Sequence, residues 1–107
     1  MYNKFGQYID GKWQQSKNKE TYEVINPATE ELIGKASKAS AEDIDKALIS
    51  AEKGFQVWKK FSPWDRAAII RKIAEQIRKK NNELAKWMTL ETGKPFAEGL
   101  AEVSGSA

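Results

Sequence analysis

Two residue types that carry much of enzyme chemistry are absent from this sequence, which has 107 residues and contains neither cysteine nor histidine. Without cysteine there is no disulfide, no thiolate nucleophile and no zinc–sulfur site. Without histidine the commonest general base and transition-metal ligand is missing. The remaining candidates for chemistry are carboxylate pairs, a Gly-Lys pair and the tryptophans.

Carboxylates stand close together at three places in the sequence, and such pairs could in principle act as general acid and base. General acid–base catalysis needs a raised carboxyl pKa, which requires burial or a like-charged neighbour in a cleft. Each pair instead lies in a predicted turn, in the first turn of a predicted helix or on a surface face, which indicates ordinary surface charges. The pairs are Glu30-Glu31, Glu42-Asp43 and Glu98 with Glu102.

The Gly93-Lys94 pair could suggest a phosphate-binding loop. Such a loop needs two glycines at fixed spacing followed by lysine and a serine or threonine, so that backbone N–H groups surround the phosphates. Here only one glycine is present and Pro95 follows the lysine. Glycine followed by proline is typical of the end of a helix, which is the interpretation we favour.

Four tryptophans could stack on bases or cofactor rings. Trp58 and Trp87 fall on apolar stripes of predicted helices, which favours a place in the core. For Trp13 and Trp64 the neighbouring residues do not indicate whether the side chain is buried. Trp64 lies in a helix first turn, where an aromatic side chain suits a partner surface.

Two β-hairpins are predicted at the start of the chain. The first covers residues 7–16, with Asp10-Gly11 as a two-residue turn between short β-forming runs. The second pairs Thr21–Ile25 with Leu32–Ala36, because the Asn26-Pro27 dipeptide ends the first run. We therefore assign residues 1–39 to a hairpin region.

Residues 40–107 form a helical region of three to four helices. Ser40 and Asp43 predict a capped helix over 40–60, although Gly54 weakens it. Ser62 and Pro63 begin a second helix that extends to Lys80. Asn81-Asn82 offers a break and a new cap before a third helix, which ends at Gly93. A fourth begins near Phe96, and the chain stops inside its apolar pattern.

Length and composition indicate one small α+β unit, covering 1–107, with no catalytic constellation of its own. The chain is 40% hydrophobic and 31% charged, and its net charge is +3. Because 15 acidic residues are interspersed with 18 basic ones, no nucleic-acid partner is expected. The sequence lacks a long apolar run and a signal-peptide core, so we expect a cytoplasmic protein with no membrane partner.

Five segments, in order and at natural spacing, resemble the N-terminal portion of the NAD(P)-dependent aldehyde dehydrogenases. The resemblance covers nearly the whole chain, and the segments are specific in combination. They are Tyr8-Ile9-Asp10-Gly11-Lys12-Trp13, Val24-Ile25-Asn26-Pro27-Ala28-Thr29, Ala51 with Phe55 and Trp58, Ser62-Pro63-Trp64-Asp65-Arg66-Ala67, and Leu90-Glu91-Thr92-Gly93-Lys94-Pro95.

The resemblance implies an α/β parent fold and an oxidoreductase that takes an aldehyde to a carboxylic acid with NAD or NADP as cofactor. This chain would be about the first fifth of such a protein, which is far longer than one typical domain. The resemblance also implies a cysteine nucleophile, a glutamate base and an asparagine oxyanion donor. None falls on this chain, so no catalytic and no cofactor-binding residue is assigned here. The Thr89–Val103 region resembles that of semialdehyde-oxidising members.

One family site is partly represented. Many members hold a structural monovalent cation, and the positions that match its ligands are the backbone carbonyls of Val24 and Ile25 and the side chain of Glu91. Hard oxygen ligands suit such an ion. Members often carry aspartate at the Glu91 position, and a further ligand comes from beyond Ala107. The alternative is that Glu91 is a plain helix-end carboxylate.

A different class of function is also open: a stand-alone helical interaction module without catalysis. In either case the apolar stripes of helices 40–60 and 62–80 cover each other only partly, and exposed apolar patches drive association. We therefore expect a homo-oligomer or self-association. The chain alone is expected to have no dehydrogenase activity, because covalent aldehyde oxidation needs a nucleophile and a hydride acceptor.

Overall fold

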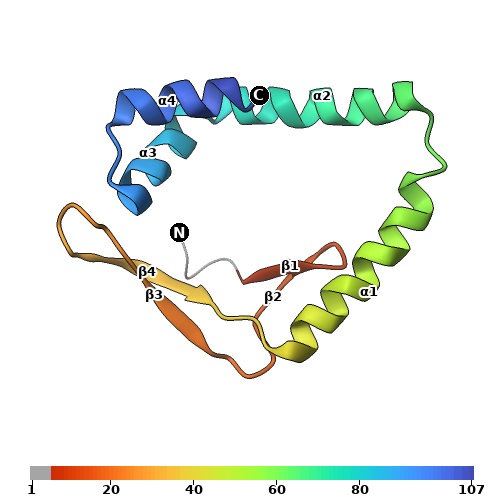
Figure 1. Cartoon of the computed structure of the whole chain (residues 1–107), viewed down its shortest axis with the longest axis horizontal. Helices are drawn as coiled ribbons and strands as arrows, with labels where there is room; N and C mark the ends of the chain where they lie inside the picture. The colour runs from red at the N-terminus through yellow and green to blue at the C-terminus, as the bar shows by residue number, and fades with distance from the viewer. Residues whose placement is uncertain (1–5) are drawn as a thin grey trace. The chain divides into compact units, whose positions relative to one another are not determined.

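A computed structural model describes residues 6–107, and the first five residues of the predicted hairpin region lie outside it. Within the described part, two strand pairs are followed by four helices (Figure 1). The α+β prediction and the upper helix count are therefore confirmed. The elements are β1 (Gln7–Ile9), β2 (Lys12–Gln14), β3 (Thr21–Ile25), β4 (Leu32–Ser37), α1 (Ala41–Trp58), α2 (Pro63–Lys79), α3 (Asn81–Thr92) and α4 (Phe96–Gly105).

These elements fall into two compact units. The first comprises the chain up to Val24 together with Leu32–Lys60, so it contains β1, β2, β4, α1 and most of β3. The second comprises Ile25–Glu31 and Phe61–Ala107, so it contains α2, α3, α4 and the loop that joins β3 to β4. None of the helices formed by residues 6–107 is both long and apolar enough to cross a membrane.

The predicted Asp-Gly turn joins β1 and β2. The strands pair antiparallel, with Tyr8 opposite Trp13, and the turn residues Asp10 and Gly11 have φ angles of 53° and 74°. Positive φ at both positions is the signature of a type I′ turn, whose twist matches that of the strands. The Tyr8 and Trp13 rings lie 5.1 Å apart, a cross-strand aromatic pair that stabilises the register.

Helix α1 begins at the predicted cap, but its apolar stripe is not a core. The side chains of Ile44, Leu48 and Phe55 are 52%, 63% and 55% exposed. Within the first unit this stripe is therefore largely exposed. The physical reason is that the two short hairpins of that unit offer too little apolar surface to cover a helix of 18 residues. Trp58, assigned to the core, is half-buried.

The buried core of the second unit lies between α3 and α4. Ala85 on α3 is fully buried, Val103 on α4 is 5% exposed, and Gly99 on α4 is buried as well. A Cβ atom placed on Gly99 would lie 3.2 Å from the backbone oxygen of Ala85. The two helices therefore approach closely because small residues face each other. Trp87, the other predicted core tryptophan, is half-buried, whereas Trp64 is 81% exposed.

The junction between α2 and α3 differs from the prediction. Lys80, not an asparagine, is the N-cap of α3, and no side chain caps that helix. The Lys80 N–H donates to the Ile77 carbonyl at 3.0 Å, so the same residue ends α2 and begins α3. No extended residue separates the helices, and Asn81 is consequently the first residue of α3 rather than its cap.

Candidate functional site

The Glu42-Asp43 pair forms a structural cap rather than an acid–base pair. Asp43 is 3% exposed and accepts hydrogen bonds from the Ser40 N–H at 2.9 Å, the Ser40 hydroxyl at 2.8 Å and the Lys17 N–H at 3.1 Å. The Asp43 N–H donates to the Ser40 hydroxyl oxygen in return. We call Ser40, Asp43 and Lys17 the α1 cap. It ties the loop after β2 to the start of the helix.

The α1 cap lowers carboxyl pKa values, which is the opposite of what a general acid needs. Hydrogen bonds from the Ser40 backbone and then its side chain hold the pKa of Asp43 below the ordinary value of 3.8, although burial opposes them. The Lys17 ammonium, which pairs with Glu42, likewise holds the pKa of Glu42 below 4.5. Both carboxylates are therefore ionised at neutral pH and serve as acceptors.

The three predicted cation ligands lie in two different units. Val24 is half-buried in β3 of the first unit, Ile25 is 49% exposed at the end of that strand, and Glu91 is exposed in the last turn of α3. Among residues 6–107, no group of three or more Asp, Glu, His or Cys side chains is placed to hold a metal. That absence does not bear on the predicted set, which uses two carbonyl oxygens and a single carboxylate.

The Gly93-Lys94 pair ends a helix, as predicted. Gly93 has a φ of 74° and its N–H donates to the Thr89 carbonyl at 2.9 Å, which closes α3 with a left-handed residue. Pro27 lies so close that a Cβ at Gly93 would be 3.1 Å from its ring. The Lys94 ammonium pairs with the Glu102 carboxylate on α4. The Gly93-Lys94 dipeptide is therefore a helix end and not a phosphate-binding loop.

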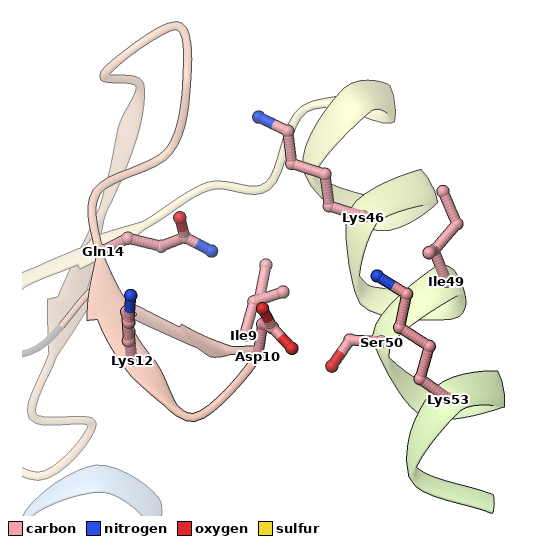
Figure 2. Close-up of a pocket in the computed structure, with 8 residues that line it drawn as sticks. All are labelled: Ile9, Asp10, Lys12, Gln14, Lys46, Ile49, Ser50 and Lys53. Atoms are coloured by element: carbon pink, nitrogen blue, oxygen red, sulfur yellow. The ribbon is translucent and has the colours of Figure 1, made fainter. Parts of the chain in front are cut away.

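The first unit contains a basic pocket of about 290 Å³ that sequence reasoning missed. Figure 2 shows side chains from the β1–β2 hairpin and from α1 turned toward a shared space. Its polar lining is Asp10, Lys12, Gln14, Lys46, Ser50 and Lys53. The available signal was the spacing of 46, 50 and 53 on one helical face and of 12 and 14 on one strand face. Only folding brings the two faces together.

An apolar groove of about 570 Å³ runs along α2 and the start of α3 in the second unit. Its apolar lining comes from Ile69, Ile73, Ile77 and Leu84. Ile73 is 55% exposed, and Ile70 beside it on the same helix is 57% exposed. These large apolar side chains therefore form an exposed row along α2.

The sequence matches the model of the aldehyde dehydrogenase family over residues 13–107. A curated relative, succinate-semialdehyde dehydrogenase [NADP(+)] 2 of Schizosaccharomyces pombe, is 39% identical over 97 residues. That match covers 91% of this chain and 20% of the relative, so the chain spans about a fifth of the length of the curated protein.

Solved structures match the fold as well. Betaine aldehyde dehydrogenase from Staphylococcus aureus in complex with NAD+ has a TM-score of 0.88 and 36% identity, over 92% of this chain and 20% of that one. A 3,6-anhydro-L-galactose dehydrogenase in complex with NADP has a TM-score of 0.91 and 30% identity, over 95% of this chain and 21% of that one. The resemblance of the five segments is therefore confirmed, and the chain belongs to the aldehyde dehydrogenase family.

Proposed function

We propose that this chain is the N-terminal part of an oxidoreductase that oxidises an aldehyde to a carboxylic acid with NAD or NADP. The observation that carries the proposal is the family match over residues 13–107, together with the 39% identity to a semialdehyde dehydrogenase. The chain's own contribution is a scaffold, because it contains no cysteine to act as a nucleophile. The cofactor, when bound by the whole protein, accepts the hydride.

Semialdehydes are the first substrates to test, since the curated relative is named for one. The segment itself is a poor guide to the aldehyde, because relatives named for a semialdehyde, betaine aldehyde and an anhydro-sugar match it with 30–39% identity. The exposed isoleucines of α2 support a homo-oligomer or self-association of the chain. The cytoplasmic location and the absence of a nucleic-acid partner stay predictions.

The activity prediction separates the scaffold from the whole enzyme. We expect the purified chain to form no NADH or NADPH above buffer with any aldehyde in a panel that includes succinate semialdehyde. We expect the whole protein, expressed from a reading frame that continues past Ala107, to reduce NAD or NADP in the same assay. Absorbance of the reduced cofactor measures both.

Each outcome decides one part of the proposal. Turnover by the chain alone would refute the proposal that it is only a scaffold. A whole protein that folds, binds neither cofactor and oxidises none of the aldehydes would remove the oxidoreductase assignment. A native product whose intact mass equals that of these 107 residues would favour the stand-alone interaction module.

We also propose that Val24, Ile25 and Glu91 supply oxygen ligands to a monovalent cation in the whole protein. The donor set fits, because carbonyl and carboxylate oxygens are hard ligands. The Glu91 carboxylate forms no ion pair or hydrogen bond with the residues that the structure describes, so it is available to an ion.

Thermal unfolding of the whole protein tests the cation site. We expect KCl or NaCl to raise the stability relative to the same concentration of choline chloride, by about 1.4 kcal/mol at ten times the Kd. Glu91→Gln should abolish the difference. Glu98→Gln, which removes an exposed carboxylate from α4 of the same unit, should leave it intact. Equal responses from both variants would show that the effect is general ionic strength.

A further inference from the structure

The lysines that line the basic pocket of the first unit carry more positive charge than the nearby carboxylates neutralise. Three lysines and one aspartate line it. Lys46 is partly compensated, because its ammonium lies 3.3 Å from the Glu42 carboxylate. Among residues 6–107, neither Lys12 nor Lys53 forms an ion pair with any carboxylate. The pocket therefore presents two uncompensated ammonium groups and a third that is shared.

The three lysines come from two elements, β2 and α1, and line the same pocket. Lys12 belongs to β2, whose register with β1 is held by the type I′ turn, and Lys46 and Lys53 lie two turns apart on α1. In Figure 2 the Gln14 amide is turned from the hairpin toward α1, and the Lys46 side chain extends from α1 toward the hairpin side. Lys12 and Lys53 line the same pocket from β2 and from α1. The α1 cap holds the chain after β2 on the start of α1, so the convergence does not depend on a loose linker.

The remaining lining indicates the kind of anion. The Gln14 amide and the Ser50 hydroxyl add neutral donors to the ammonium groups. Lysine binds phosphate as a point charge with three donors, and a phosphate monoester carries about −1.5 to −2 at neutral pH. Ile9 and Ile49, which also line the pocket, offer apolar contact to an organic group. A volume of 290 Å³ suits a small molecule rather than a polymer.

We propose that the pocket between the β1–β2 hairpin and α1 binds a small phosphate-bearing anion through Lys12, Lys46 and Lys53. Asp10 faces the same space and opposes such a ligand, so it limits the affinity. The site lies wholly in the first unit and includes none of the positions considered for the cation.

Inorganic pyrophosphate is the probe, and the readout is the backbone amide NMR spectrum of the 107-residue chain at low ionic strength. We expect saturable shifts confined to residues around Lys12, Gln14, Ser50 and Lys53. Lys53→Gln and Lys12→Gln should each weaken binding roughly two- to fivefold, because each removes one exposed pair between an ammonium group and the phosphate. Asp10→Asn should tighten it, and an Asn-Gly dipeptide preserves the type I′ turn.

Lys86→Gln is the matched control, since it removes the same charge from an exposed position on α3 in the other unit. Its affinity for pyrophosphate should equal that of the wild type. An equal loss in Lys86→Gln and Lys53→Gln would show that only the net charge of the chain matters, and would overturn the site. Absence of saturable shifts would overturn it as well. Equal affinity for succinate would overturn the assignment to phosphate.

Discussion

Gly99→Leu is expected to separate α3 from α4 and to lower the stability of the second unit by roughly 2 kcal/mol. A Cβ at position 99 would lie 3.2 Å from the Ala85 carbonyl oxygen and 3.5 Å from the Ala85 Cβ, and a leucine needs far more room. Overpacking costs about 1–3 kcal/mol, and separation also exposes Val103. The gain from removing a helical glycine, about 1 kcal/mol, is smaller.

Gly54 provides the matched control, because it also lies inside a helix but nothing stands within 4 Å of its Cβ position. Gly54→Ala should raise stability by about 1 kcal/mol, whereas Gly99→Ala should change it little, since the close contact cancels the gain. Circular dichroism on heating and hydrogen exchange of the α3 and α4 amides measure the effects. If Gly99→Leu and Gly54→Leu behaved alike, the close approach of the helices would be refuted.

Asp43→Asn is expected to release the loop after β2 from α1, with a fall in Tm several times that caused by Asp65→Asn. In the wild type the buried carboxylate accepts bonds from the Ser40 and Lys17 backbone N–H groups and from the Ser40 hydroxyl. All three bonds end on Oδ2, and the Lys17 N–H also lies 3.3 Å from Oδ1. Asparagine keeps one acceptor oxygen, but it loses the negative charge and places an NH2 donor where the second oxygen stood, next to the Lys17 N–H. The exchange rate of the Lys17 amide reports the loss directly.

The same substitution should remove a pH dependence of stability. Hydrogen bonds from Ser40 lower the pKa of Asp43 in the folded chain below its ordinary value of 3.8. The folded state therefore binds this proton less tightly than the unfolded state does. The stabilisation is fully present above pH 3.8 and is lost as the pH falls through the lower, folded-state pKa. The pKa of Glu42 is also lowered, so Glu42 makes stability depend on pH in the same direction. The quantity to measure is therefore the difference in free energy of unfolding between the wild type and Asp43→Asn.

Asp65 is the control because it occupies the same position in the other capped helix. The Ser62 hydroxyl donates to its carboxylate at 2.7 Å, and its N–H donates back to the Ser62 oxygen, but the site is exposed. Asp65→Asn should therefore cost little. Comparable losses in the two variants, or a wild type and an Asp43→Asn chain with the same stability profile below pH 3.8, would refute the role given to the α1 cap.

Local signals predicted well wherever neighbouring residues decide the structure. The Asp10-Gly11 turn, the Ser40 and Ser62 caps and the glycine that ends α3 each depend on backbone groups within a few residues. Prediction failed at Lys80, where two helices join without the extended residue that an asparagine cap requires. Periodicity predicted which side chains of α1 share a face, but it does not say whether anything covers that face.

The sequence by itself determined the order of the elements and, through five segments at natural spacing, the family. It also determined that these 107 residues offer no cysteine thiol as a nucleophile. Only the tertiary structure showed that Asp43 is a buried cap, that Gly99 packs closely against Ala85 of the neighbouring helix, and that Lys12 shares a pocket with Lys46 and Lys53. The physical reason is distance along the chain: turns and caps are satisfied locally, whereas burial and charge convergence come from residues that meet only after folding.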